Sequence, residues 1–331
     1  MQTTPRSALA IILSLALLAP TAVFAADEKK DEKKDVSKIG ERDVGKGINL
    51  YSLESEIALG KQLSQQIEQT ARLVQDPVVV AYVDKVAQNL VRNSDARVPF
   101  TVKVIDSEEI NAFALPGGFF YINSGLVLAA DEEAELAGVM AHEIAHVTAR
   151  HATRQATKAQ ITQWALIPAI IFLPGGWAGY GIYQGLNFGL PLAFLKFSRD
   201  AEREADFLGV QYMYKAGYDP TAFISFFEKI REKERKQPGS VPKVFSSHPP
   251  TGERVTRAQS EIASLLPDQP EYVVSTSEFD QVRARLAQLA AGRKIEDEKS
   301  DRPTLRTREK KEGDEEEKKE EEKPPVLKRR D

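Results

Sequence analysis

Apolar residues recur along this chain with two different periods, and each period predicts one kind of element. Spacings of three and four residues are typical of helices with one buried face, and they predict helices over 53–74, 78–93, from about 131 through 151, 199–216, 220–236 and 252–266. Residue-by-residue alternation predicts strands at 100–106 and 118–125. The pattern therefore predicts an α+β fold that is mostly helical, with a small antiparallel sheet beside the helix that begins near Asp131.

The two ends of the chain differ from this patterned middle. Residues 1–25 combine a basic residue, a short apolar stretch and a small final residue, which is typical of a cleaved export signal; an uncleaved anchor is the alternative. Residues 26–43 and 293–331 are rich in charge and predict a solvated linker and a disordered tail. The predicted folded domain is therefore 44–292.

The amino-acid composition limits the partners and the reactive groups that this protein can have. The net charge is -4, and basic residues are matched by acidic ones, so we expect no nucleic-acid partner. There is no cysteine, which excludes disulfides, a thiol nucleophile and thiolate zinc ligands. A metal site in this protein would have to be built from histidines and carboxylates.

Residues 159–195 carry no charged side chain, and prolines and glycines interrupt them. Each apolar arm is shorter than the roughly 20 residues that cross a bilayer as a helix. Three interpretations remain open: a lid over a cleft, a hairpin in which residues 161–195 contact a membrane surface, and a buried core segment.

Three of the four histidines stand within ten residues, at positions 142, 146 and 151. Residues four apart share a helix face, so His142 and His146 can bind one ion, and Glu143 is placed to reach a water on it. This H-E-x-x-H spacing is typical of zinc hydrolases, with two ligands and a general base; two structural histidines are the alternative. At about 100° per residue, His151 is expected to point away from the other two.

A third ligand is expected from another helix, because two histidines do not complete a zinc site. Glu202 and Asp206 in "SRDAEREADFLG" are again four residues apart. Glu202 would complete the site, and Asp206 would accept a hydrogen bond from a ligand imidazole. A solvated acidic helix face is the alternative.

Three stretches in order, "NAFALPGGFFYINSGLV", "AHEIAHVTARH" and "SRDAEREAD", resemble the family of zinc metallopeptidases that includes HtpX, the CAAX prenyl endopeptidase and periplasmic BepA-like proteases. The similarity covers residues 50–265 and is strongest to the BepA-like members, although a charged tail stands here where those often have tetratricopeptide repeats. It implies a gluzincin-type metallopeptidase domain in the periplasm. It also implies one zinc ion per chain, with these residues in the site: ligands His142, His146 and Glu202, base Glu143 and supporting Asp206.

The same resemblance points to His248 in "SSHPPTGER", a histidine that approaches the zinc and holds the enzyme latent. An oxyanion donor and an ordinary loop histidine are the other interpretations. The segment around Asn111, Ala112, Phe113 and Ala114 is expected to form an edge strand that binds an extended peptide, with a plain structural hairpin as the alternative.

These features predict an exported zinc endopeptidase that degrades unfolded or misassembled envelope proteins, with Glu143 activating a zinc-bound water. A competing hypothesis is a non-catalytic, chaperone-like binder in which the zinc is structural. In that case His248 would supply the fourth ligand of a closed site.

Overall fold

The computed structural model describes four parts of the chain, residues 32–172, 197–236, 248 and 251–300. The chain divides into two compact units, Met1–Ala287 and Gln288–Asp331, and the site lies in the first. The predicted export segment, residues 173–195 and the end of the charged tail lie outside the described residues. The expectations about them stay predictions.

The helices begin where the sequence provides caps. The side chain of Ser52 accepts a hydrogen bond from the Ser55 N–H, and that of Asp76 accepts from Val78 and Val79, with Pro77 at the first helical position. The predicted helices are all present, with ends that differ by a few residues. Their bounds are α1 Leu53–Glu68, α2 Pro77–Arg92, α3 Ser124–Ala129, α4 Glu133–Thr148, α5 His151–Phe172, α7 Arg199–Lys215, α8 Thr221–Lys236, α10 Gly252–Leu265 and α11 Ser277–Ser300, with short 3₁₀ turns η1 Glu32–Lys34, η2 Val36–Lys38 and η3 Pro116–Gly118.

The sheet has three strands in the order β1-β3-β2, with bounds β1 Thr101–Ile105, β2 Ala112–Leu115 and β3 Phe119–Asn123. The predicted small sheet is therefore confirmed, with one correction, since it is mixed rather than antiparallel. The tight turn η3 makes β2 and β3 antiparallel, whereas the connection from β1 to β2 passes over β3 and leaves β1 parallel to β3.

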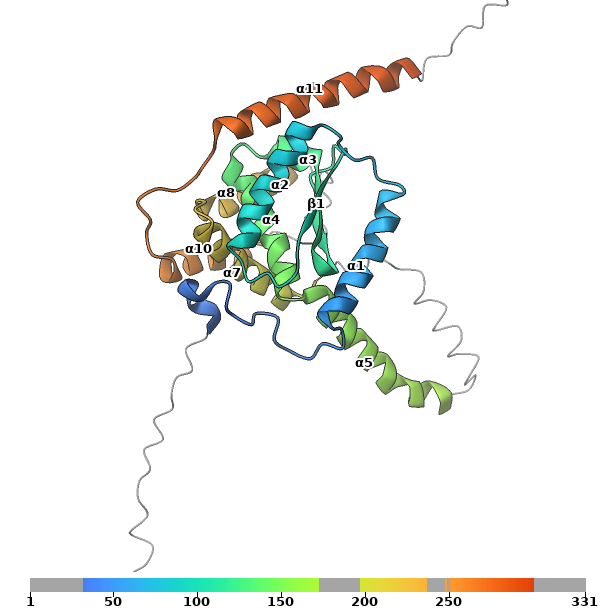
Figure 1. Ribbon diagram of the computed structural model, residues 1–331. Helices are drawn as coiled ribbons and strands as arrows, with labels where there is room; N and C mark the ends of the chain where they lie inside the picture. Colours follow the sequence, from blue (N-terminus) through green and yellow to red (C-terminus); the bar gives the residue numbers. More distant parts are fainter. Residues whose placement is uncertain (1–31, 173–196, 237–247, 249–250, 301–331) are drawn as a thin grey trace, which may run out of the picture. The chain divides into compact units, whose positions relative to one another are not determined.

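Helices cover both faces of this sheet, as Figure 1 illustrates. Phe120 and Ile122 of β3 point into the main core with α2 and α4, whereas Phe119 and Tyr121 pack with Leu63 on the α1 side. The alternation along β3 thus divides the apolar side chains between two layers.

The helix α4 is the centre of the unit, because every residue from Glu133 to Thr148 is buried. It packs against α2, α7, α8 and β2. Gly209 of α7 allows a close approach between α7 and α4, since a Cβ there would lie 3.3 Å from the backbone of His142. A side chain at position 209 would separate the two helices that carry the predicted ligands.

The histidine-bearing helix is not continuous, contrary to the prediction. α4 ends at Thr148, Arg150 adopts a left-handed backbone with φ of 56°, and α5 begins at His151. The Arg150 side chain secures this break by pairing with Glu56 at 2.7 Å and donating to the Tyr51 carbonyl at 2.5 Å. The break changes the direction in which His151 points.

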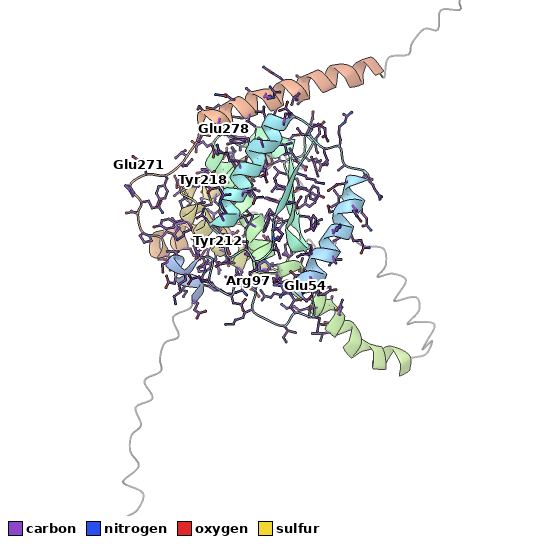
Figure 2. All side chains as sticks on the ribbon, viewed as in Figure 1. Glu54, Arg97, Tyr212, Tyr218, Glu271 and Glu278 are labelled. Carbon is purple, nitrogen blue, oxygen red and sulfur yellow. The ribbon has the colours of Figure 1, made fainter. Side chains whose placement is uncertain are left out.

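Residues 32–43, predicted as part of a solvated linker, are packed against the domain, which corrects that prediction for this part. Arg42 is 3% exposed and forms a salt bridge of 2.6 Å with buried Asp95. Tyr212 of α7, labelled in Figure 2, donates a hydrogen bond to the same carboxylate at 2.9 Å. The physical reason is that Ile39 and Val44 flank the charges and enter the core, which composition alone does not reveal.

At the other end, α11 continues to Ser300, so residues 293–300 are helical rather than disordered as predicted. Opposite charges stand four residues apart there in the sequence, a spacing that supports helix formation. None of the helices in the described part of the chain combines the length and apolar character needed to cross a membrane.

Gly60→Ala is expected to destabilise the fold, although alanine normally favours a helix over glycine. The added Cβ would lie 1.8 Å from the Pro116 carbonyl oxygen, so α1 would have to move from the turn η3. We expect the free energy of unfolding to fall by about 1–3 kcal/mol, as for other overpacked sites, in urea titrations followed by circular dichroism.

Gly292→Ala is the matched control, because nothing lies within 4 Å of its added Cβ. It should leave stability unchanged or raise it slightly. Equal behaviour of the two variants would contradict the close contact between α1 and η3.

Candidate metal centre

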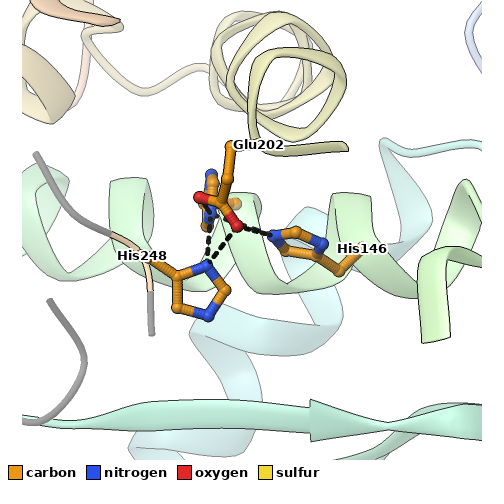
Figure 3. A group of neighbouring side chains, drawn as sticks. His146, Glu202 and His248 are labelled. Atoms are coloured by element: carbon orange, nitrogen blue, oxygen red, sulfur yellow. Dashed lines mark hydrogen bonds and ion pairs between the residues drawn. The ribbon is translucent and has the colours of Figure 1, made fainter. Parts of the chain in front are cut away.

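Four side chains from three parts of the chain converge in the interior. His142 and His146 come from α4, Glu202 from α7 and His248 from the short described position before α10. One donor atom from each lies within 4.8 Å of the others, and all four residues are buried. Figure 3 shows the carboxylate of Glu202 between the labelled rings of His146 and His248.

The distances among these atoms match a metal site better than a hydrogen-bond network. His142 Nε2 lies 3.1 Å from His146 Nε2, and the Glu202 oxygens lie 3.5 Å from each of these nitrogens. Donors bound to a tetrahedral zinc at about 2.0–2.1 Å stand about 3.3 Å apart. Two imidazoles and one carboxylate are also the ligand types that zinc takes in hydrolases, so the residues present fit the ion.

His248 lies within the same set of distances. Its Nδ1 is 2.8 Å from Glu202 Oε1 and 3.4 Å from His142 Nε2, and its Nε2 is 3.7 Å from Glu143 Oε1. The structure therefore brings this distant histidine together with the three ligands expected from spacing.

Asp206 lies beside the ring of His142, as the sequence predicted. Its Oδ1 is 3.0 Å from His142 Nδ1, which turns the Nε2 of that ring toward the centre. Burial lowers the pKa of His142, but Asp206 and Glu202 outweigh burial and raise this pKa to about 9. A metal would therefore compete with a proton for the Nε2 of His142.

Arg254 binds the two carboxylates of the centre, a role that was not predicted from the sequence. Its guanidinium donates to both oxygens of Asp206 at 2.7 and 2.6 Å, lies 3.1 Å from Glu202, and also donates to the His248 carbonyl at 3.1 Å. A buried arginine offsets two buried carboxylates here. The only available signal was its position in the "TGER" that follows His248.

Glu143, the predicted base, is buried next to the donor atoms. Its Oε1 has no hydrogen-bond partner within the described residues. Burial raises the pKa of Glu143, while the nearby imidazoles of His248 and His142 oppose that rise. A carboxylate with a raised pKa is a better proton acceptor than an ordinary glutamate.

The predicted substrate segment lies beside this carboxylate. Ala112 and Ala114 are buried in β2, and the Ala114 backbone hydrogen-bonds to Glu143. Phe113 stacks on Tyr121 with ring centroids 5.2 Å apart, and the Asn111 carbonyl accepts from the Asn123 N–H at 2.9 Å. Among the described strands, β2 is paired only with β3, so its other edge is unpaired.

Two aromatic neighbours complete the surroundings of His146. His151 was expected to point away, but the break at Arg150 turns it inward and places its Nδ1 2.8 Å from His146 Nδ1. Phe197 stacks on the His146 ring at 4.0 Å between centroids, and nothing in the sequence indicated this role.

Two histidines one turn apart on a buried helix, a glutamate from a second helix and an acid beside the first histidine define a gluzincin-type metallopeptidase centre. The sequence model of peptidase family M48 matches residues 75–262. The chain belongs to this family, as its motifs predicted.

Several relatives support the assignment. The chain is 32% identical over 241 residues to the beta-barrel assembly-enhancing protease of Escherichia coli K12, covering 71% of this chain and 48% of that protein. It is 31% identical over 287 residues to the putative beta-barrel assembly-enhancing protease of Vibrio cholerae, covering 85% and 57%. It is 33% identical over 182 residues to the mitochondrial metalloendopeptidase OMA1 of Schizosaccharomyces pombe, covering 54% and 51%. The chain thus spans about half the length of these curated relatives.

Glu202→Gln is expected to weaken zinc binding strongly, because an amide oxygen is a poorer ligand than a carboxylate and Arg254 would lose one of its two acidic partners. The loss of affinity should exceed the roughly 10–100-fold that follows loss of an outer partner. Competition with a chromophoric chelator measures it. Asp200→Asn, an exposed change on the same helix, is the control; equal affinities of the two variants would contradict the proposed ligand.

Proposed function

We propose that this protein is a zinc-dependent endopeptidase in which Glu143 activates the attacking water. The observation that carries the proposal is the buried Glu143 Oε1, which has no hydrogen-bond partner among the described residues and lies beside a zinc-type donor set. A zinc ion bound there would polarise the scissile carbonyl and lower the pKa of a water to about 7. Glu143 would accept the proton of that water and deliver it to the leaving amine.

The substrate would bind as an added strand. Asn111, Ala112, Phe113 and Ala114 lie along the unpaired side of β2, next to Glu143. Backbone hydrogen bonds along an edge strand require an extended peptide but little sequence preference. This favours unfolded or misassembled proteins as substrates, because their segments are free to extend.

We infer that His248 holds the resting enzyme latent. Its Nδ1 lies 3.4 Å from His142 Nε2, the spacing of two ligands on one zinc, and 2.8 Å from Glu202 Oε1, within hydrogen-bond distance. A catalytic zinc keeps one position for water, so His248 would have to withdraw before cleavage. The oxyanion role is the second possibility, in which His248 would donate to the developing negative charge.

The closed set of four donors also supports a second candidate function. Four protein ligands are typical of structural zinc, so the same geometry suits a non-catalytic binding module with a chaperone-like role. The two functions differ in what they require of Glu143. A structural site does not require a buried carboxylate such as Glu143, whose Oε1 has no hydrogen-bond partner among the described residues, and this favours the peptidase.

We place the enzyme in the periplasm, acting on envelope proteins. The export signal expected at residues 1–25 supports the location, and two relatives named beta-barrel assembly-enhancing protease support an envelope role. Contact with a membrane surface through residues 161–195 is part of the same proposal and follows from their uncharged sequence.

Glu143→Gln should retain zinc and lose cleavage. The amide keeps the size of the side chain but cannot accept the water's proton, and loss of a general base typically costs about 10²–10⁴-fold in rate. Cleavage of denatured casein and metal content by mass spectrometry test both halves. A variant with full activity would exclude Glu143 as the base.

His248→Ala separates the two roles proposed for this side chain. At matched zinc content, faster cleavage of denatured protein is expected if His248 is a latch, because the open position becomes available to water. Slower cleavage by an otherwise active enzyme would assign the oxyanion role instead. No cleavage by either form would favour the binding module.

A further inference from the structure

A chain of polar contacts leads from the second histidine ligand to the protein surface. His151 is 3% exposed, and its Nδ1 lies 2.8 Å from the Nδ1 of His146. Its other ring nitrogen, Nε2, lies 3.1 Å from Glu204 Oε2 on α7. The three side chains therefore form one continuous series that begins on the far side of a ligand ring.

Proton positions along this series follow from the chemistry of each end. His146 Nε2 faces the other donor atoms, 3.1 Å from His142 Nε2 and 3.5 Å from Glu202, so a bound metal would take its lone pair. The proton of a neutral His146 is then on Nδ1 and is donated to His151. Because His151 Nδ1 accepts, the proton of His151 is on Nε2, where the Glu204 carboxylate accepts it.

We propose that His151 is a positioning residue that fixes the tautomer and ring orientation of the ligand His146, with Glu204 holding His151 in the accepting tautomer. The inference rests on the proposed zinc binding by His146. His151 would thus orient His146 as Asp206 orients His142. The acceptor at the Nδ1 of His146 is a neutral imidazole, whereas the acceptor at the Nδ1 of His142 is a carboxylate.

Surrounding contacts leave His151 and Glu204 little freedom. Glu204 also pairs with Lys33 and, at 3.2 Å, with Arg154, so its carboxylate is held from two sides. Phe197 stacks on His146 and lies 5.9 Å from the His151 ring. The left-handed Arg150 is what directs His151 inward, because an uninterrupted helix would have carried it to another face.

A purely structural histidine is the competing explanation, and metal-free stability distinguishes it from a positioning role. His151→Phe keeps an aromatic ring of similar size but cannot accept from His146. His151→Asn retains an acceptor at the position of Nδ1. Thr157→Val is the matched control, because Thr157 is fully buried on the same helix and bonds to Leu50 and Asn49 without touching a ligand.

The experiment compares these variants in the full mature chain by three readouts. They are zinc affinity from chelator competition, the visible spectrum after cobalt substitution, and the Tm of the metal-free protein. We expect His151→Phe to lose about 10–100-fold in zinc affinity, the effect of losing a partner that orients a ligand, and to show an altered cobalt spectrum. His151→Asn should recover most of the affinity, and Thr157→Val should bind zinc like the wild type.

Zinc affinity and a cobalt spectrum identical to wild type in His151→Phe would overturn the proposal. The proposal would also be overturned if His151→Phe and His151→Asn lost zinc affinity equally and in proportion to a lower Tm of the metal-free protein. That result would assign His151 a structural role.

Glu204→Leu and Glu204→Gln give a second test if His151→Phe does not fold. The leucine variant should bind zinc several-fold more weakly than the glutamine variant, which still accepts from His151, and equal affinities would contradict the series. Failure of the wild type to bind zinc would instead refute the metal centre itself.

Discussion

The complete burial of α4 is the constraint on which the rest of the structure depends. A helix without a solvent-facing side must satisfy its polar side chains within the protein, because an unpaired buried group costs about 1–3 kcal/mol. His142, Glu143 and His146 all lie on this helix. The neighbouring helices α7 and α10 therefore face it with carboxylates and an arginine, and the same contacts that satisfy the histidines also bring their Nε2 atoms together.

The buried negative charges of the centre explain why an arginine and several histidines surround them. Glu202 and Asp206 bring negative charge into a low-dielectric interior, which is tolerable only when each carboxylate has partners. Arg254 contacts both carboxylates, His142 shares Asp206 Oδ1 with it, and the histidines of the centre also lie against the Glu202 oxygens. One arginine thus connects the ligand helix α7 to the segment that carries His248, so the position of the proposed latch is coupled to the acidic half of the centre.

Much of this could be predicted from the sequence because it depends on local periodicity. The spacing of His142 and His146, and of Glu202 and Asp206, decides which side chains share a face of an α-helix whatever the helix packs against. Arg254, Phe197 and the inward turn of His151 could not be predicted this way. Their roles arise from contacts between segments far apart in the chain, or from one backbone angle that breaks a regular period.

The sequence by itself predicted the α+β class, most of the helices, and two pairs of residues that share a helix face, His142 with His146 and Glu202 with Asp206, since these follow from residue type and from spacing within single elements. Only the tertiary structure decided that β1 runs parallel to β3, that residues from 32 onward belong to the folded body, and that His248 reaches Glu202. The physical reason is that long-range contacts depend on how elements pack and close their loops. A periodic pattern records which face of an element is buried but not which partner buries it.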